Sequence, residues 1–326
     1  MDFPVILKEY AGYKISIQNR SRKTVDQYCT DLALFFRYTV SSRAGKEPSG
    51  EDFEKIDISG CGAEFVRSIS TEEIYAFLLY AASDRGNGAR ARARKLSSIK
   101  GFYKYMCVIR HEVADNIAKD IEAPSIRPAL PKYLSLEESR ELLHAVKEDT
   151  KNPRRVRDYC IITLFLNCGM RLSELVGINI SDIDRSLSYL RVLGKGSKER
   201  IIYLNEACRK ALGEYMSVRS EERVIKDANA LFISSRGTRM ATNSVQHVVY
   251  KYLAAAGLEY KHYSVHKLRH TAATLMYQTG KVDVRVLKDI LGHEQLSTTQ
   301  IYTHVSDAQM ARAMDENPLA KGEDDG

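Results

Sequence analysis

Apolar residues in the first third of the chain recur with the spacing of amphipathic helices. Residues 21–40 begin with a Ser- and Thr-containing stretch, which suits a helix N-terminus, and then repeat large apolar side chains every three or four positions. These side chains are Val25, Tyr28, Leu32, Phe35 and Phe36. The pattern predicts a helix with one face buried in a core.

The next two segments differ in character. Residues 41–60 are rich in Gly, Ser and charged side chains, and they predict a surface loop. Residues 70–83 predict another helix, because Ser70 or Thr71 can cap it and acidic residues occupy the first turn, where the helix dipole favours them. The first part of the chain is therefore expected to be helical.

A basic segment follows over residues 85–110. It contains eight Lys or Arg residues and no Asp or Glu, and its apolar stripe consists of Leu96, Ile99, Tyr103 and Met106. Most runs of charge are solvated helix faces, but such faces usually mix both signs, so a helix that contacts phosphates is the alternative. The candidate DNA-binding residues are Arg90, Arg92, Arg94, Lys95, Lys100 and Lys104.

Residues 122–135 divide the chain. They hold three of its seven prolines, which block helix continuation and favour an extended linker. The C-terminal end is acidic and typical of a flexible tail. The expected parts are a helical domain over 1–124, a linker over 125–132, a second domain over 133–318 and a tail over 319–326.

The second domain mixes helices with one β-hairpin. Residues 135–146 open with a capping-box pattern, and residues 157–169 read as an apolar helix that ends at a glycine. In residues 189–204 apolar positions alternate on both sides of a Gly- and Lys-rich turn, which predicts an antiparallel hairpin. The expected fold is an α-rich two-domain protein, with an N-terminal all-α bundle and a C-terminal α+β domain that contains a small antiparallel sheet.

Composition narrows the class of protein. At 326 residues, with 44% hydrophobic and 28% charged residues, the chain is typical of a two-domain globular protein. No apolar run is long enough to cross a bilayer and the N-terminus is a poor signal peptide, so we expect a cytoplasmic protein without a membrane partner.

The six scattered cysteines favour free buried thiols over a disulfide or zinc framework. The net charge of +7 fits a polyanionic partner without requiring one.

Four short motifs in the second domain carry the candidate chemistry. Their reactive residues are Arg171, Lys195, His266 with Arg269, and His293 with Tyr302. Taken singly, each motif has an ordinary alternative: an arginine paired with Glu174 at a helix start, a solvated turn lysine, a surface His–Arg pair, or a histidine after a helix stop. The tyrosine is one of 19, and most tyrosines are half-buried rings.

Two other ligand sites are disfavoured by the same residues. His266 and His270 have the spacing of a zinc-binding His-Glu-x-x-His motif. However, Lys267 replaces the glutamate and Arg269 stands between the histidines, so positively charged side chains would surround a bound zinc ion. Residues 194–200 superficially resemble a phosphate loop but lack its residue order and a following helix. We therefore expect neither a metal nor a nucleotide cofactor.

Together the four motifs describe an anion site. They have few acidic neighbours, whereas metal-assisted phosphoryl transfer needs carboxylates to hold Mg²⁺. Each arginine can bind two phosphate oxygens and stabilise the charge that develops on them. The nucleophile must then be a hydroxyl. A phenol has a pKa of about 10, so a histidine must help remove its proton, and a lysine on a hairpin tip can protonate the leaving alkoxide.

These motifs follow one another in the order R…K…H-x-x-R…H…Y, within "GMRLSELVGI", "GKGSKER", "HKLRHTAAT" and "LGHEQLSTTQIYTH". In this order and spacing the chain resembles the tyrosine recombinase (phage integrase) family, and most closely its Xer-type members. The resemblance is strong from about residue 133 to 318. It is looser in the N-terminal half, which is similar to the helical, SAM-like core-binding domain of that family through residues 23–38 and 91–106.

The resemblance implies a nucleophile and its proton-transfer partners. Tyr302 would attack the scissile phosphodiester and form a 3′-phosphotyrosyl link, which frees a 5′-hydroxyl. Lys195 would protonate the leaving 5′-oxygen, and His266 would assist proton transfer at the tyrosine. Because the ester bond is kept in the covalent intermediate, the reaction would be reversible and would need neither ATP nor a metal.

The resemblance also implies the groups that hold the phosphate. Arg171 and Arg269 would clamp its non-bridging oxygens, and Glu174 would support the first of these arginines from behind. His293 would hydrogen-bond the phosphate. The two domains would close around the DNA duplex as a clamp, mostly through phosphate contacts.

The implied partners are a double-stranded DNA recombination site and further copies of the chain. The family acts as a tetramer on two duplexes, here either a homo-tetramer or an assembly with a paralogous recombinase, and residues 306–320 are the candidate helix for docking on a neighbour. The 41–62 segment is longer than in compact Xer proteins, so chromosome dimer resolution and mobile-element integration or excision both stay open. Two alternatives remain: DNA relaxation like that of a type IB topoisomerase, and a DNA-binding regulator without catalysis.

Overall fold

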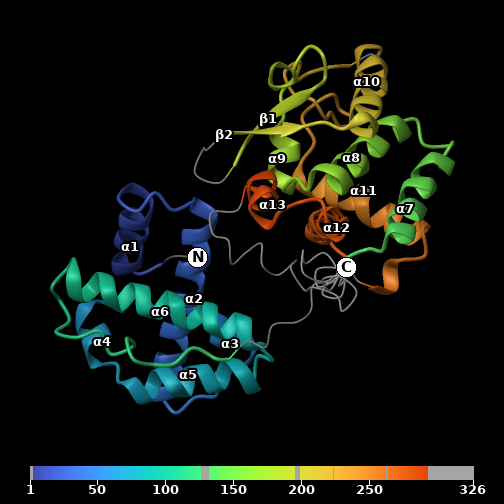
Figure 1. Ribbon diagram of the computed structural model, residues 1–326. Helices are drawn as coiled ribbons and strands as arrows, with labels where there is room; N and C mark the ends of the chain where they lie inside the picture. The colour runs from blue at the N-terminus through green and yellow to red at the C-terminus, as the bar shows by residue number, and fades with distance from the viewer. Residues whose placement is uncertain (1–2, 126–131, 195–198, 223, 262, 293–326) are drawn as a thin grey trace, which may run out of the picture. The chain divides into compact units, whose positions relative to one another are not determined.

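The computed structural model describes residues 3–125, 132–194, 199–222, 224–261 and 263–292 (Figure 1). The chain divides into two compact units, Met1–Pro128 and Ala129–Gly326. The first unit is helical, and the second combines helices with a two-stranded antiparallel sheet. The fold class expected from the sequence is thus confirmed.

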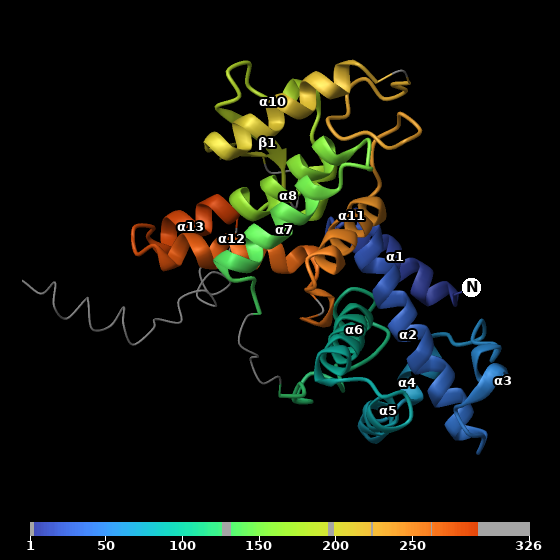
Figure 2. The same cartoon turned by 90° about the vertical axis from the view of Figure 1, so that its right-hand side faces the viewer.

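The N-terminal unit is built on three helices around an aromatic core. Its elements are α1 (Val5–Ser16), α2 (Arg22–Arg43), α3 (Gly50–Glu54), α4 (Ala63–Ser68), α5 (Thr71–Ser83) and α6 (Ala89–Val108). Helices α2, α5 and α6 pack against one another (Figure 2). Between them Phe35, Phe77 and Phe102 are fully buried, so the apolar stripes expected from the sequence form this core.

Side-chain caps begin two of these helices where the sequence predicts them. The Ser21 hydroxyl accepts the Thr24 N–H at 3.3 Å at the start of α2. At the start of α5, Ser70 and Glu73 form a reciprocal capping box, so Ser70 rather than Thr71 is the cap. Each cap satisfies backbone donors that the first helical turn cannot pair.

The predicted loop over residues 41–60 is partly wrong. Helix α2 runs on to Arg43, and the short helix α3 occupies Gly50–Glu54. One residue explains the second difference, because Phe53 is buried against the ring of Tyr80, with centroids 6.0 Å apart. A single apolar anchor of this kind leaves no periodic pattern in the sequence.

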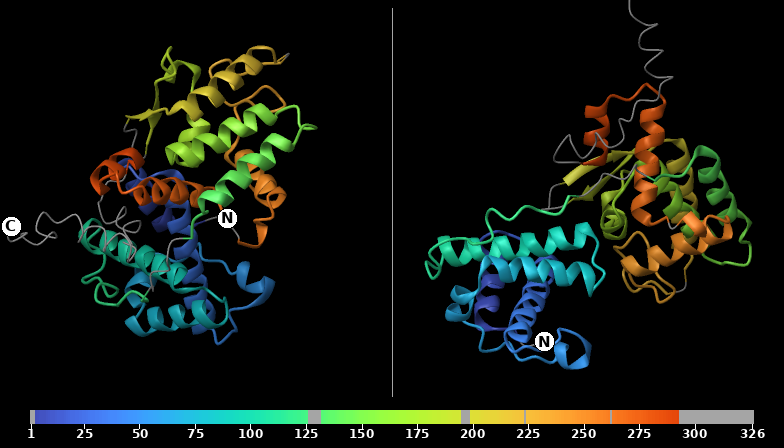
Figure 3. Two further views of the ribbon diagram at one scale, coloured as in Figure 1. Left: turned by 45° about the vertical axis from the view of Figure 1, so that its right-hand side comes forward. Right: turned by 90° about the horizontal axis from the view of Figure 1, so that it is seen from below.

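The C-terminal unit is organised around a buried central helix. Its helices are α7 (Leu136–Glu148), α8 (Arg155–Cys168), α9 (Leu172–Gly177), α10 (Glu206–Ser220), α11 (Thr242–Ala255), α12 (Val265–Gln278) and α13 (Val284–Leu291), with short 3₁₀ turns at Ile180–Asp182 and Glu259–Lys261. Helix α8 packs against α7, α10 and α12, and α13 lies beside α12 (Figure 3). The capping box of Ser135 and Glu138 starts α7 as predicted.

The predicted β-hairpin consists of β1 (Tyr189–Leu193) and β2 (Glu199–Tyr203). Its register pairs Leu190 with Ile202 and Val192 with Arg200. The side chains of Leu190, Val192 and Ile202 are buried on the inner face. Because strand side chains alternate, Arg200 lies on the same inner face as Ile202.

All six cysteines are free, and five of them are buried, which confirms the interpretation as buried thiols. Within the described ranges, no helix is both long enough and apolar enough to span a bilayer.

Candidate active site

A tight turn between α8 and α9 positions the first candidate arginine. Gly169 ends α8 in the left-handed conformation, with φ 58°, and its N–H donates to Phe165 O. A Cβ at this position would lie 2.8 Å from the Leu291 side chain, so the turn requires glycine for its backbone and for its close packing. Arg171 follows as the N-cap of α9.

Glu174 lies at the centre of the described part of the site and is only 2% exposed. Arg171 donates to it twice, from Nη1 to Oε1 at 2.7 Å and from its backbone N–H to Oε2 at 2.7 Å. Arg200 Nη2 donates to Oε2 at 2.8 Å, and Arg269 Nη1 lies 4.0 Å from the same oxygen. Helices α9 and α12 and strand β2 thus bring three guanidinium groups to one buried carboxylate.

The C-terminal end of α13 supplies acceptors to the same three arginines. A helix C-terminus leaves its last carbonyl groups unpaired and carries partial negative charge. Each arginine donates to one of the last three carbonyl groups. The pairs are Arg171 Nη2 with Gly292 O at 2.7 Å, Arg269 Nη2 with Leu291 O at 2.6 Å, and Arg200 Nη1 with Ile290 O. The site therefore consists of a guanidinium cluster held by one carboxylate and one helix end.

The charge state of Glu174 follows from its surroundings. Burial by itself would raise the pKa of the carboxyl, but the hydrogen bond and charge of Arg200, followed by the hydrogen bonds from Arg171, outweigh burial and lower the pKa below its usual value. Glu174 is therefore ionised at neutral pH. Its negative charge neutralises part of the positive charge that the three arginines bring together.

His266 lies near the start of α12, one turn before Arg269. The residue is exposed, but its ring stands edge to face against His270, with centroids 4.6 Å apart and planes at 81°. The part of the ring that packs against the protein still loses water, which lowers the pKa of His266, and the charges of Arg269, Lys267 and Arg171 lower it further. The neutral imidazole that results can accept a proton.

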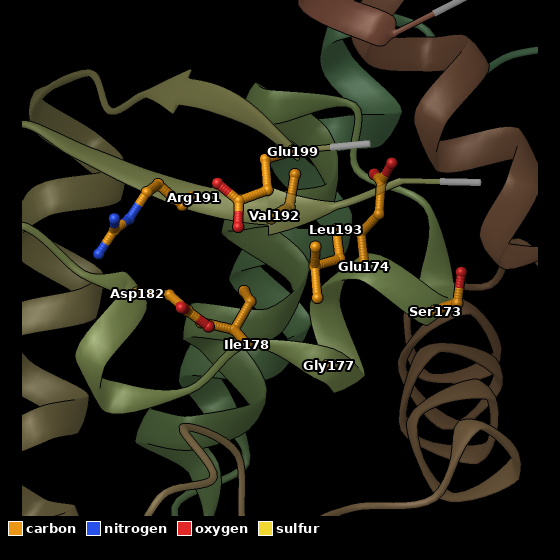
Figure 4. A pocket seen from close by; sticks show the side chains of 9 residues that line it. All are labelled: Ser173, Glu174, Gly177, Ile178, Asp182, Arg191, Val192, Leu193 and Glu199. Carbon is orange, nitrogen blue, oxygen red and sulfur yellow. The ribbon is translucent and has the colours of Figure 1, made fainter. Parts of the chain in front are cut away.

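A small pocket of about 110 Å³ lies between α9 and the hairpin (Figure 4). Glu174, Asp182 and Glu199 contribute three carboxylates to its lining, and Arg191 contributes one guanidinium. Such a lining repels a phosphate. In the arginine cluster, Arg171 has 32% of its side chain exposed.

The structure places only part of the predicted site. Arg171, Arg269 and Glu174 are brought together, and His266 precedes Arg269 by one helical turn. Lys195, His293 and Tyr302 lie outside the described residues. Among the residues that are described, no group of three or more His, Cys, Asp or Glu side chains is arranged to hold a metal ion.

The six basic residues predicted to bind DNA all lie on α6, but not all of them reach the surface. Lys95 is buried, with Nζ 3.2 Å from Asp31 Oδ1, and Arg94 also pairs with Asp31. Arg92 and Lys100 are half-buried, whereas Arg90 and Lys104 are exposed. Lys95 is therefore paired with Asp31 of α2. The prediction that Lys95 contacts phosphate does not fit this buried position.

Arg200 is the participant that the motifs alone did not single out. It lies in "GKGSKER", in which the family resemblance implies a role only for Lys195. The alternation of "ERIIYL" carried a usable signal, because an arginine two positions before the inward-facing Ile202 must itself face inward. A charged residue on the buried face of a strand requires a partner.

The chain is similar to known proteins in sequence and in fold. The profile of the Phage integrase family matches residues 132–309. The tyrosine recombinase XerC of Caldanaerobacter subterraneus subsp. tengcongensis is 46% identical over 321 residues, which cover 98% of this chain and 89% of the relative. The XerC of Thermodesulfovibrio yellowstonii is 34% identical over 306 residues, or 92% of each protein. The crystal structure of the XerH site-specific recombinase bound to difH substrate has a TM-score of 0.69 at 22% identity and covers 95% of this chain and 83% of that one. The chain belongs to the phage integrase family of tyrosine recombinases, as the order of its motifs predicts.

Proposed function

We propose that this protein is a site-specific recombinase of the Xer type, which cuts and rejoins DNA through a 3′-phosphotyrosyl intermediate. Its relatives are named as XerC tyrosine recombinases. The observation that carries the proposal is the convergence of Arg171 and Arg269 on the buried carboxylate of Glu174. A cluster of guanidinium groups that is partly exposed to solvent is suited to bind a phosphodiester.

The two clamp arginines differ in access. Arg171 has 32% of its side chain exposed, whereas Arg269 has 2%. We propose that the scissile phosphate first meets Arg171 and then reaches Arg269 behind it. The guanidinium groups stabilise the negative charge that develops on the non-bridging oxygens, because their positions are fixed before the reaction begins.

The proposed bond changes balance without an external cofactor. The Tyr302 oxygen loses its proton with help from His266 and forms a bond to phosphorus, while the bond from phosphorus to the 5′-oxygen breaks. Lys195 gives that oxygen a proton, and His293 donates a hydrogen bond to the phosphate. One phosphodiester-like ester replaces another, so neither ATP nor a metal is required, and the reverse reaction rejoins the strand.

The proposed partners and assembly follow from this chemistry. The substrate is a double-stranded DNA site, and strand exchange between two duplexes requires a tetramer, formed by this chain alone or with a paralogous recombinase. We propose residues 1–124 as the core-binding domain and 133–318 as the catalytic domain, joined by a linker over 125–132. We also propose that the protein acts on DNA in the cytoplasm, either in chromosome dimer resolution or on a mobile element.

One comparison of assays tests the proposal. A recombinase converts DNA with two matching sites into exchanged products, whereas an enzyme like a type IB topoisomerase relaxes supercoils without a second site. We expect two-site recombination at full rate in EDTA on sites selected from a DNA library by covalent trapping. Relaxation without exchange would favour the topoisomerase alternative, DNA binding without any adduct would favour a regulator, and a strict requirement for Mg²⁺ would contradict the metal-free mechanism.

The lowered pKa of His266 predicts a pH dependence. If neutral His266 accepts the tyrosine proton, cleavage falls as the pH drops through its pKa, which lies below the ordinary value of about 6.5. Removing the positive charge of Lys267 raises that pKa. We therefore expect the acidic limb of the single-turnover cleavage rate to move to higher pH in Lys267→Gln. The exposed Lys281→Gln is the matched control, and a limb that does not move would argue against His266 as the proton acceptor.

The two exposed basic residues of α6 are expected to differ from Lys95 in DNA binding. Arg90→Gln or Lys104→Gln should each lower the slope of log affinity against log salt by about one unit, because each loses one phosphate contact. Lys95→Met should leave that slope unchanged, because Lys95 already forms an ion pair with Asp31. Fluorescence anisotropy over a salt series measures all three variants. A lower slope for Lys95→Met would show that Lys95 leaves Asp31 when DNA binds.

A further inference from the structure

Arg200 joins three separate elements of the C-terminal unit. It extends from β2, where its backbone pairs with Val192 of β1. Its Nη2 donates to Glu174 Oε2 on α9 at 2.8 Å, and its Nη1 donates to Ile290 O on α13. Both ends of the guanidinium fork thus have protein partners, and 13% of the side chain is exposed.

The contact with Glu174 is part of the arrangement that orients Arg171. Oε2 accepts from Arg200 and from the Arg171 backbone N–H, while Oε1 accepts from the Arg171 side chain. A planar carboxylate held at both oxygens cannot rotate. Without Arg200, the carboxylate loses the charged donor on Oε2, and the side-chain contact that holds the Arg171 guanidinium becomes less well fixed.

The contact with α13 is equally close. Gly292 has φ 62°, and a Cβ on it would lie 2.8 Å from Cδ and 2.9 Å from Nε of Arg200. The Arg171 Nη1 atom would lie 3.6 Å from the same Cβ. The end of α13 therefore rests directly on the Arg200 side chain, and only glycine allows this approach.

We propose that Arg200 is a positioning residue for strand cleavage: by holding Glu174 and the end of α13 together, it sets the orientation of Arg171 toward the scissile phosphate. This inference rests on the proposed function. Arg200 acts through Arg171 rather than on the DNA, because each of its Nη atoms donates to a protein acceptor, Glu174 or Ile290, and only 13% of its side chain is exposed. It also differs from a purely structural residue, because it bonds to the carboxylate that holds a clamp arginine.

The test compares Arg200→Met and Arg200→Lys with the unsubstituted full chain on a nicked duplex whose site was selected by covalent trapping. Single-turnover experiments at saturating DNA give the rate constant and the final amount of adduct. We expect Arg200→Met to slow adduct formation by about 10- to 100-fold, as for residues that orient catalytic ligands, with unchanged DNA affinity and unchanged final amplitude. The rate constant of Arg200→Lys should lie between those of Arg200→Met and the unsubstituted chain, because one ammonium group cannot reach both acceptors. Arg191→Met, an exposed arginine on β1, is the matched control.

Two modified substrates separate the possible roles. In a methylphosphonate, a neutral methyl group replaces one charged non-bridging oxygen, so the cleavage rate depends less on the guanidinium groups that clamp the phosphate. The slower cleavage of Arg200→Met should therefore largely disappear on this substrate. In a substrate with sulfur in place of the 5′-bridging oxygen, the leaving group needs no proton, and the defect should persist. Rescue by the sulfur substrate alone would overturn the inference, because Arg200 would then act on leaving-group protonation.

Gly292→Ala provides an independent variant that keeps the arginine. Its added methyl group must displace Arg200, so we expect the same slower rate and the same rescue by methylphosphonate. A lower final amplitude with an unchanged rate constant in both variants would indicate a folding role alone and overturn the inference, as would unchanged cleavage. If the unsubstituted chain forms no adduct on any selected site, the proposed function itself fails, and this inference fails with it.

Discussion

Replacing Tyr302 with phenylalanine is expected to abolish the covalent adduct between the protein and DNA while the affinity for the same DNA is retained. The substitution removes one hydroxyl oxygen, and without it no bond to phosphorus can form. The lost group supplies no counter-charge, so phosphate contacts elsewhere are unaffected. A nicked suicide substrate, from which the cleaved strand diffuses away, traps the adduct for detection on a denaturing gel.

The control for this substitution is another tyrosine of the same chain. Tyr203 lies on the outer face of β2 with 78% of its surface exposed, and Tyr203→Phe should form adduct like the unsubstituted protein. Adduct that persists in Tyr302→Phe would assign the nucleophile to a different residue. Unchanged behaviour of Tyr302→Phe in every assay is what a DNA-binding regulator without catalysis predicts.

The elements that the sequence predicts well are those whose causes are local. Ser70 with Glu73, and Ser135 with Glu138, are neighbours along the chain, so their capping boxes can be read as motifs. The alternation of residues 189–204 likewise requires a hairpin. Helix α3 could not be predicted, because its one anchor, Phe53, gains its burial from Tyr80 on another helix.

The same distinction explains what could be predicted of the site. The order of the motifs and the family resemblance identified Arg171, Glu174 and Arg269, and the structure brings these three together. The charge of Lys95, in contrast, suggested DNA binding, and the sequence gives no sign that Asp31 neutralises it from another helix. The role of Arg200 depends in the same way on α9 and α13, which lie far from it along the chain.

Glu174→Gln is expected to cause the largest loss of stability of any single substitution in the guanidinium cluster. Glutamine offers one acceptor oxygen where the structure uses two, and its NH₂ group would face an arginine donor. Three guanidinium groups would also lose their shared negative charge. Breaking a buried ion pair in this way typically lowers the free energy of unfolding by about 3–5 kcal/mol, and we expect cleavage to be lost as well because Arg171 loses its orientation.

The pH dependence of stability provides a second signature of Glu174. Its folded pKa is lower than its unfolded value of about 4.3, so its ionised form stabilises the fold fully above that pH. This contribution is lost as the pH falls through the lower, folded pKa. Hydrogen exchange of the α8 and α9 amides in a urea series, at neutral and acidic pH, should therefore show a steeper acid loss in the unsubstituted chain than in Glu174→Gln. Glu141→Gln, an exposed glutamate on α7, should behave like the unsubstituted chain. Equal stability of Glu174→Gln and Glu141→Gln would show that the arginine cluster does not depend on its carboxylate.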